Sequence, residues 1–148
     1  MNYKMMGRFI AQILAIEWVF MIPALILSLV FGESGATYGF LLTLGAILAA
    51  LVILRLLCRG APSAFYAKEG FVCVGASWIV LSLFGCLPFW LSREIPAFID
   101  AFFEIVSGFT TTGSSILNNV EALSKSLIYW RSFSHWLGGM GVLASVSP

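Results

Sequence analysis

The sequence predicts an all-α membrane protein that crosses the bilayer several times. Of its 148 residues, 60% are hydrophobic and only 10% are charged, whereas a soluble domain has about half apolar and about a quarter charged residues. The mean hydropathy is +0.99, and the apolar residues gather in runs long enough to cross a bilayer as helices. The net charge of +1 and the lack of a basic cluster in the sequence give no indication of nucleic acid binding.

Three long apolar runs open the chain. They occupy residues 9–31, 38–57 and 70–92, and the third contains Pro88 near its end. A glycine-containing turn at 32–37 is predicted to separate the first two runs, and residues 58–69 link the second to the third. Each run is predicted to be a membrane-spanning helix.

One acidic residue, Glu17, lies inside the first run. A carboxyl group is unfavourable in lipid, so we expect it to face the helix bundle or the interface. It would serve either as an ion or proton relay or as a structural hydrogen-bonding group.

The basic residues predict the orientation of these helices. Five of the eight Lys and Arg residues fall on one side of the three runs: Lys4, Arg8, Arg55, Arg59 and Lys68. Because short loops rich in Lys and Arg stay in the cytoplasm, the amino terminus is predicted to be cytoplasmic. Most acidic residues fall on the outer side, where they either raise the local cation concentration or are solvated loop charges.

A shorter apolar segment follows at residues 97–109. A helix rises 1.5 Å per residue, so this segment reaches only about 20 Å, less than the roughly 30 Å hydrocarbon core. It is predicted to be a re-entrant half-helix whose carboxyl end favours a cation. Asp100 and Glu104 lie one turn apart on it. Paired carboxyl groups also suit acid–base catalysis, but no nucleophile, metal cluster or catalytic partner accompanies them, so we do not expect an enzyme.

The stretch at residues 107–115 is rich in hydroxyl side chains and contains glycine. This composition disfavours both a helix and a strand. Irregular backbone at membrane depth must line a water-filled cavity or be buried in protein. Backbone oxygens of such loops replace the water shell of a potassium ion. We therefore predict that Thr110, Thr111, Thr112 and Gly113 form one strand of a cation selectivity filter. Thr111, Thr112 and Gly113 are the expected potassium ligands, and no cofactor is expected beside the transported ion.

Residues 125–146 are predicted to begin another crossing, with Ser124 as its N-cap. Arg131 would either support the loop and the acids of the half-helix by a charged hydrogen bond or reach to the membrane interface. His135 is either a proton sensor or a packed hydrogen-bonding residue. The glycines within 138–141 allow close backbone approach or a hinge. The candidate supports of the filter are Asp100, Glu104 and Arg131.

Four stretches together resemble the Trk-type potassium uptake pore subunits of the Trk/Ktr/HKT superfamily. They are D-A-F-F-E at 100–104, S-G-F-T-T-T-G at 107–113, Y-W-R-S at 129–132 and W-L-G-G-M-G at 136–141. The order and the spacing of these stretches match the family, as do their residues.

The resemblance implies two leading helices followed by four repeats, each a membrane helix, a pore helix, a filter loop and a second membrane helix. Residues 1–60 would hold the leading helices and 61–148 the first repeat. Three further repeats are missing from this sequence, so we expect the chain to be a truncated, amino-terminal part of such a subunit.

The implied function is potassium uptake across the inner (cytoplasmic) membrane as part of a Trk-type transporter. Thr110, Thr111 and Thr112 would supply filter oxygens, and Gly113 would be the filter glycine. The family also implies a homodimer within the lipid bilayer and a cytoplasmic nucleotide-binding regulatory subunit. The alternative is a non-conducting membrane fragment that lacks three of the four pore repeats.

Overall fold

The structure is a computed structural model that describes residues 3–59 and 67–146. The regular elements in this part of the chain are all helical, as the sequence predicts. They are α1 (Tyr3–Val30), α2 (Ser34–Leu57), α3 (Ala67–Gly85), α4 (Leu87–Leu91), α5 (Phe98–Phe109), the 3-10 helix η1 (Val120–Ala122) and α6 (Lys125–Val146). The boundary predicted between residues 60 and 61 lies outside the described residues.

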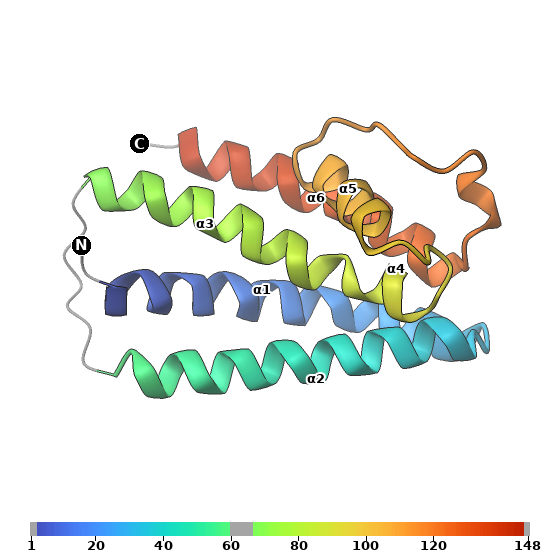
Figure 1. Cartoon of the computed structure of the whole chain (residues 1–148), viewed down its shortest axis with the longest axis horizontal. Helices are drawn as coiled ribbons and strands as arrows, with labels where there is room; N and C mark the ends of the chain where they lie inside the picture. The colour runs from blue at the N-terminus through green and yellow to red at the C-terminus, as the bar shows by residue number, and fades with distance from the viewer. Residues whose placement is uncertain (1–2, 60–66, 147–148) are drawn as a thin grey trace.

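Within residues 3–59 and 67–146, three helical segments are long and apolar enough to cross a membrane: α1, α2 and Gly70–Leu91, which comprises most of α3 together with α4. The long helices lie side by side, and α1 contacts α2, α3 and α6 (Figure 1). The chain runs along α1, returns along α2, and repeats this path in α3 and α6. As a result, the start of α1 and the end of α6 lie at the same end of the bundle.

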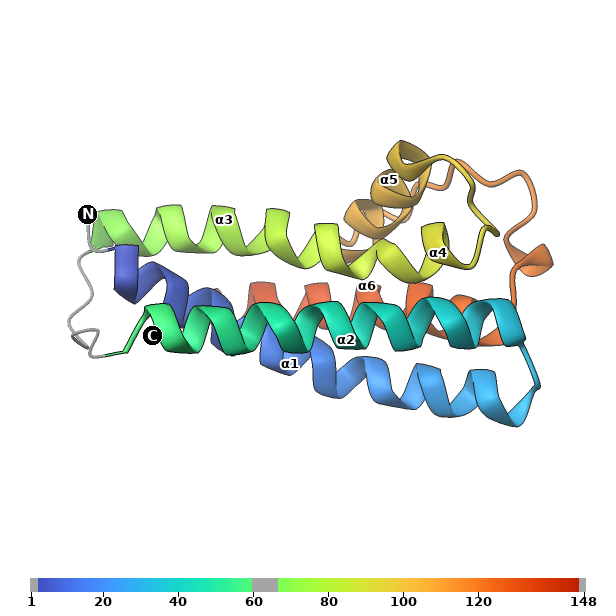
Figure 2. The ribbon, with the colours of Figure 1, turned by 60° about the horizontal axis from the view of Figure 1, so that its bottom comes forward.

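The short helix α5 lies at the other end, packed against α6 and α3 (Figure 2). Its 12 residues rise about 18 Å, which is less than the roughly 30 Å core of a bilayer. The short helix predicted at 97–109 is therefore present, one residue shorter at its start. The loop that follows α5 returns along the outside of the bundle to η1 and the start of α6.

The turn predicted at residues 32–37 is wrong at its end, because α2 begins at Ser34. Gly32 takes a left-handed conformation with φ of 68° and reverses the chain. The amide of Thr37 then donates to the carbonyl of Glu33 at 2.8 Å, so helical bonding begins at once. The hydroxyl of Thr37 also lies 3.0 Å from Ser28 Oγ, which ties the start of α2 to the end of α1.

The third predicted span is divided in two by a break after Gly85. Pro88 lies in the first turn of α4, where its missing N–H leaves no helical bond unmade. The indole Nε1 of Trp130 in α6 donates to the carbonyl of Gly85 at 2.9 Å. This buried bond provides a partner for a carbonyl at the break, as a membrane interior requires.

Candidate ion-binding site

The short helix α5 ends because the backbone after Phe109 leaves the helical path. Ala101, Ile105 and Phe109 are buried in the core of the bundle, so one face of α5 is fixed by apolar packing. The Thr111 amide donates to the carbonyl of Gly108 at 2.9 Å. Thr111 itself has φ of 56°, a left-handed conformation that is uncommon for a residue other than glycine. This turn redirects the chain out of the helix.

The loop after α5 folds back onto Ser107, which is buried in the last turn of that helix. Its carbonyl accepts hydrogen bonds from the amides of Thr112 at 2.9 Å and Gly113 at 3.3 Å. Its hydroxyl donates to the carbonyl of Ser114 at 2.6 Å. Gly113 has φ of 77°, which glycine adopts without strain. A single residue thus anchors three consecutive residues of the loop.

The four predicted filter residues form one continuous stretch beyond this anchor. Residues 110–113 are all exposed, whereas Ser107, Gly108 and Phe109 just before them are buried. The hydroxyl of Thr110 donates to the carbonyl of Val106 at 2.8 Å, and Thr110 Oγ1 and Thr112 Oγ1 lie 2.8 Å apart. The stretch follows the carboxyl end of α5, and this end of a helix carries partial negative charge. The carbonyls of Val106, Ser107 and Gly108 in the last turn accept hydrogen bonds from the loop itself.

Glu104 joins the loop to α6. Its side chain is fully buried, and its two oxygens accept the hydroxyl of Ser115 at 3.0 Å each. Glu104 Oε2 also accepts the amide of Ile116 at 3.1 Å. Arg131 on α6 donates its Nε to Glu104 Oε1 in an ion pair that is mostly shielded from solvent. A charged hydrogen bond of this kind is stronger than a neutral one and fixes direction.

Asp100, the other acid of α5, is not part of this cluster. It lies in the first turn of the helix and is half-buried, a position where a negative charge stabilises the helix dipole. The structure thus brings Glu104 and Arg131 together under the loop and leaves Asp100 about one turn away on α5.

Two glycines let α6 approach the base of the loop. A Cβ on Gly138 would collide with the carbonyl of Phe109, and a Cβ on Gly108 would collide with Ser134 Oγ. On the same side of α6, His135 Nδ1 lies 3.0 Å from the carbonyl of Arg131. A Cβ on Gly113 would lie 4.0 Å from His135 Nε2. The lone histidine is therefore held beside the predicted filter glycine.

Ser124 was predicted to cap α6, but its side chain bonds another residue and does not accept an amide of the helix. Ser124 precedes the helix, but its amide and its hydroxyl both donate to the carboxylate of Glu94. The cap comes from Glu33, whose oxygens accept the amides of Lys125 at 2.7 Å and Ser126 at 3.1 Å. A carboxylate there also satisfies the positive end of the helix dipole. No local sequence pattern marks this contact, because Glu33 belongs to the turn between α1 and α2.

Glu17 lies beside a separate cavity of about 540 Å³ between α1, α3 and α6. Its side chain is buried, and neither carboxyl oxygen has a hydrogen-bond partner among the described residues. Phe109, the last residue of α5, also lines this cavity. Glu17 is therefore oriented toward the bundle, one of the two placements predicted, and the cavity reaches the end of α5 from which the predicted filter stretch starts.

The family of the chain is decided by a match that includes this loop. The family model described as "TrkH: Cation transport protein" matches residues 39–146, from the first turns of α2 to the end of α6. The chain belongs to the TrkH family of cation transport proteins.

Curated relatives agree with the TrkH assignment. The chain is 32% identical over 144 residues to the Trk system potassium uptake protein TrkH of Halomonas elongata, which covers 97% of this chain and 30% of that protein. It is 39% identical over 77 residues to TrkG of Escherichia coli K12, covering 51% of this chain and 16% of TrkG. An uncharacterized cation transporter of Methanocaldococcus jannaschii is 43% identical over 67 residues, covering 45% of this chain and 14% of that protein. The chain thus spans about 30% of the length of the TrkH relatives that it matches throughout.

Proposed function

We propose that this chain supplies one strand of a potassium-selective filter to a Trk-type transporter in the cytoplasmic membrane. The main observation in support is the exposed stretch at residues 110–113, which follows the carboxyl end of a helix too short to cross a bilayer. The relatives named as potassium uptake proteins support potassium as the ion.

The proposed mechanism requires no covalent step. A potassium ion sheds water and is coordinated by backbone oxygens of Thr111, Thr112 and Gly113, which replace its hydration shell. The partial negative charge at the carboxyl end of α5 attracts the ion. The ion then moves down its electrochemical gradient.

The supports of the loop set its shape. Ser107 fixes the backbone from below, and Glu104 holds the following residues through Ser115 and Ile116. Arg131 neutralises the buried charge of Glu104, because an unpaired carboxylate there would be strongly unfavourable. We infer that this pair keeps the coordinating oxygens in place while the ion exchanges.

The orientation proposed for the bundle places the start of α1 in the cytoplasm and the loop toward the outside. Lys4, Arg8, Arg55 and Arg59 lie at the end of the bundle where α1 begins and α2 ends, and basic residues favour the cytoplasmic side. Two such subunits forming a dimer, and a cytoplasmic nucleotide-binding subunit below it, complete the proposal from family resemblance.

A second candidate is a non-conducting membrane fragment. It is favoured by the exposure of residues 110–113, because one strand contacts an ion from one side only. Rubidium uptake tests whether the chain conducts by itself. Vesicles that contain the 148-residue chain alone should take up no rubidium beyond protein-free vesicles, and a clear signal would show that copies of this chain complete a filter together.

The filter assignment is tested in the whole transporter that contains this sequence. Gly113→Ala places a side chain at φ of 77°, whereas Gly45→Ala, on an open face of α2, meets nothing within 4 Å. A left-handed alanine costs about 1–2 kcal/mol, so rubidium uptake should fall about tenfold for Gly113→Ala. Equal uptake by both variants at equal expression would remove the filter role from Gly113.

A further inference from the structure

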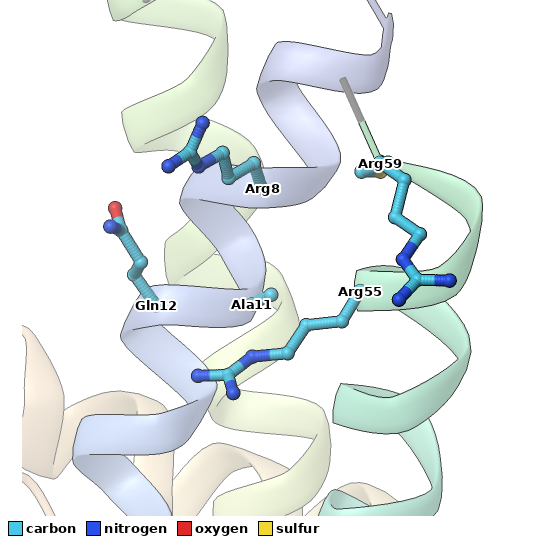
Figure 3. Close-up of a pocket in the computed structure, with 6 residues that line it drawn as sticks. Arg8, Ala11, Gln12, Arg55 and Arg59 are labelled. Atoms are coloured by element: carbon cyan, nitrogen blue, oxygen red, sulfur yellow. The ribbon is translucent and has the colours of Figure 1, made fainter. Parts of the chain in front are cut away.

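A basic pocket lies between α1 and α2 at the end of the bundle farthest from the ion-binding loop. It has a volume of about 430 Å³, within the range of about 300–1,000 Å³ usual for ligand sites. Its lining residues are Arg8, Ala11, Gln12, Arg55, Cys58 and Arg59. Figure 3 shows Arg55 reaching from α2 toward α1, with Arg8 and Gln12 on the facing helix.

The pocket is a product of helix register. Arg8 and Gln12 are one helical turn apart on α1. Arg55 lies in the last turn of α2, and Arg59 lies two residues beyond its end. The two helices approach closely here, because a Cβ on Gly7 would collide with Cys58 Sγ. Close approach of the backbones brings the arginines of both helices around one hollow.

The positive charge of the pocket is not balanced within the described part of the chain. None of the three arginines forms an ion pair with a described carboxylate. The positive charge of Arg55 is stabilised by the negative carboxyl end of α2, because Arg55 lies in the last turn of that helix. Arg8 lies near the positive amino end of α1, so the helix dipole does not stabilise its charge. An anion in the pocket would balance this charge.

We propose that this pocket binds the phosphate group of an anionic phospholipid. Guanidinium groups hold phosphate oxygens through paired hydrogen bonds, and basic pockets between membrane helices on the cytoplasmic side bind anionic lipid head groups. On the other face of this end of α2, Ile53, Leu56 and Leu57 are more than half exposed, as expected of a helix end that lies in lipid. The assignment to the cytoplasmic leaflet rests on the orientation given under the proposed function.

Native mass spectrometry of the 148-residue chain in neutral detergent tests this binding. The probes are phosphatidylglycerol, phosphatidylcholine and inorganic phosphate. Each of Arg8→Gln, Arg55→Gln and Arg59→Gln should weaken phosphatidylglycerol binding about fivefold. Arg55→Lys keeps the charge but loses the paired geometry, so its affinity should fall between those of the wild type and Arg55→Gln.

Arg93→Gln is the matched control, because Arg93 is an exposed arginine in the loop between α4 and α5, at the opposite end of the bundle. It should leave phosphatidylglycerol binding unchanged. Phosphatidylcholine, which has a phosphate but no net charge, should bind more weakly than phosphatidylglycerol. Circular dichroism and gel filtration establish that each variant keeps its helices and its size.

Two results would overturn the proposal. Phosphatidylglycerol binding that is equal in the wild type and in the triple Arg→Gln variant would remove the pocket as its site. Inorganic phosphate bound as tightly as phosphatidylglycerol would show that the free anion, not the lipid, is the ligand. Both readouts are independent of ion conduction and of orientation, so a failed filter assignment or a reversed topology leaves this test intact.

Discussion

Glu33 and Ser126 are 93 positions apart and share two hydrogen bonds. Glu33 Oε2 accepts the amide of Ser126 at 3.1 Å and its hydroxyl at 2.5 Å, while Glu33 Oε1 accepts the amide of Lys125. The turn between the first two helices therefore caps α6, the helix that follows the loop at residues 110–119. This contact makes the two leading helices part of the support of the loop.

Glu33→Ala should destabilise the start of α6. Loss of a helix cap costs about 0.5–2 kcal/mol, and two amides of α6 lose their acceptor together. Hydrogen exchange of residues 125–128 in detergent should accelerate accordingly. Glu121→Ala serves as the control, because Glu121 is exposed on η1. Equal exchange in the two variants would show that the cap has no energetic weight.

Arg131→Gln should destabilise the loop more than the replacement of any solvent-exposed charged residue. It leaves the carboxylate of Glu104 buried without its cation, and breaking a buried pair in this way costs about 3–5 kcal/mol. We expect a lower midpoint of thermal unfolding and faster exchange at residues 112–117. The double variant Arg131→Gln with Glu104→Gln should recover part of the loss, and a double variant worse than both single ones would contradict the pair.

Neighbouring glycines on α6 offer a matched test of helix approach. Gly138→Ala would collide with the carbonyl of Phe109, whereas a Cβ on Gly139 meets nothing within 4 Å. Overpacking of this kind costs about 1–3 kcal/mol. The midpoint of thermal unfolding in detergent should therefore fall for Gly138→Ala and remain nearly unchanged for Gly139→Ala. The reverse order would mean that α5 and α6 are packed in another register.

Glu17→Leu distinguishes the two roles open to this buried acid. Its oxygens have no hydrogen-bond partner among the described residues, so replacing it by an apolar side chain should stabilise the chain by about 1–3 kcal/mol. Denaturant unfolding of the chain measures this gain. A loss of stability would show that the carboxyl group makes a structural bond. A stabilised chain with reduced rubidium uptake in the whole transporter would indicate the relay role.

Local features of the sequence were enough to predict the long helices, the short helix α5 and the irregular stretch after it, but not the break after Gly85, the start of α2 at Ser34 or the 3-10 helix η1. The length of the apolar segment at 97–109 predicts a helix too short to span, and hydroxyl residues followed by glycine predict an irregular stretch after it. The link between Arg131 and Glu104 was one of two alternatives, because sequence spacing cannot show which way a long side chain turns.

Contacts between distant segments could not be predicted in this way. The cap from Glu33 and the placement of Arg8 and Arg55 around one pocket depend on how far each helix slides along its neighbour. That register is set by packing at positions such as Gly7 and Gly138, and a single sequence does not reveal which glycines face another backbone.

The attachment of the loop to Ser107 has a mechanical consequence. Ser107, in the last turn of α5, is hydrogen-bonded to Thr112, Gly113 and Ser114. We therefore expect this part of the loop to move together with α5 when that helix tilts. In the proposed filter, a tilt of α5 would therefore shift the coordinating oxygens together.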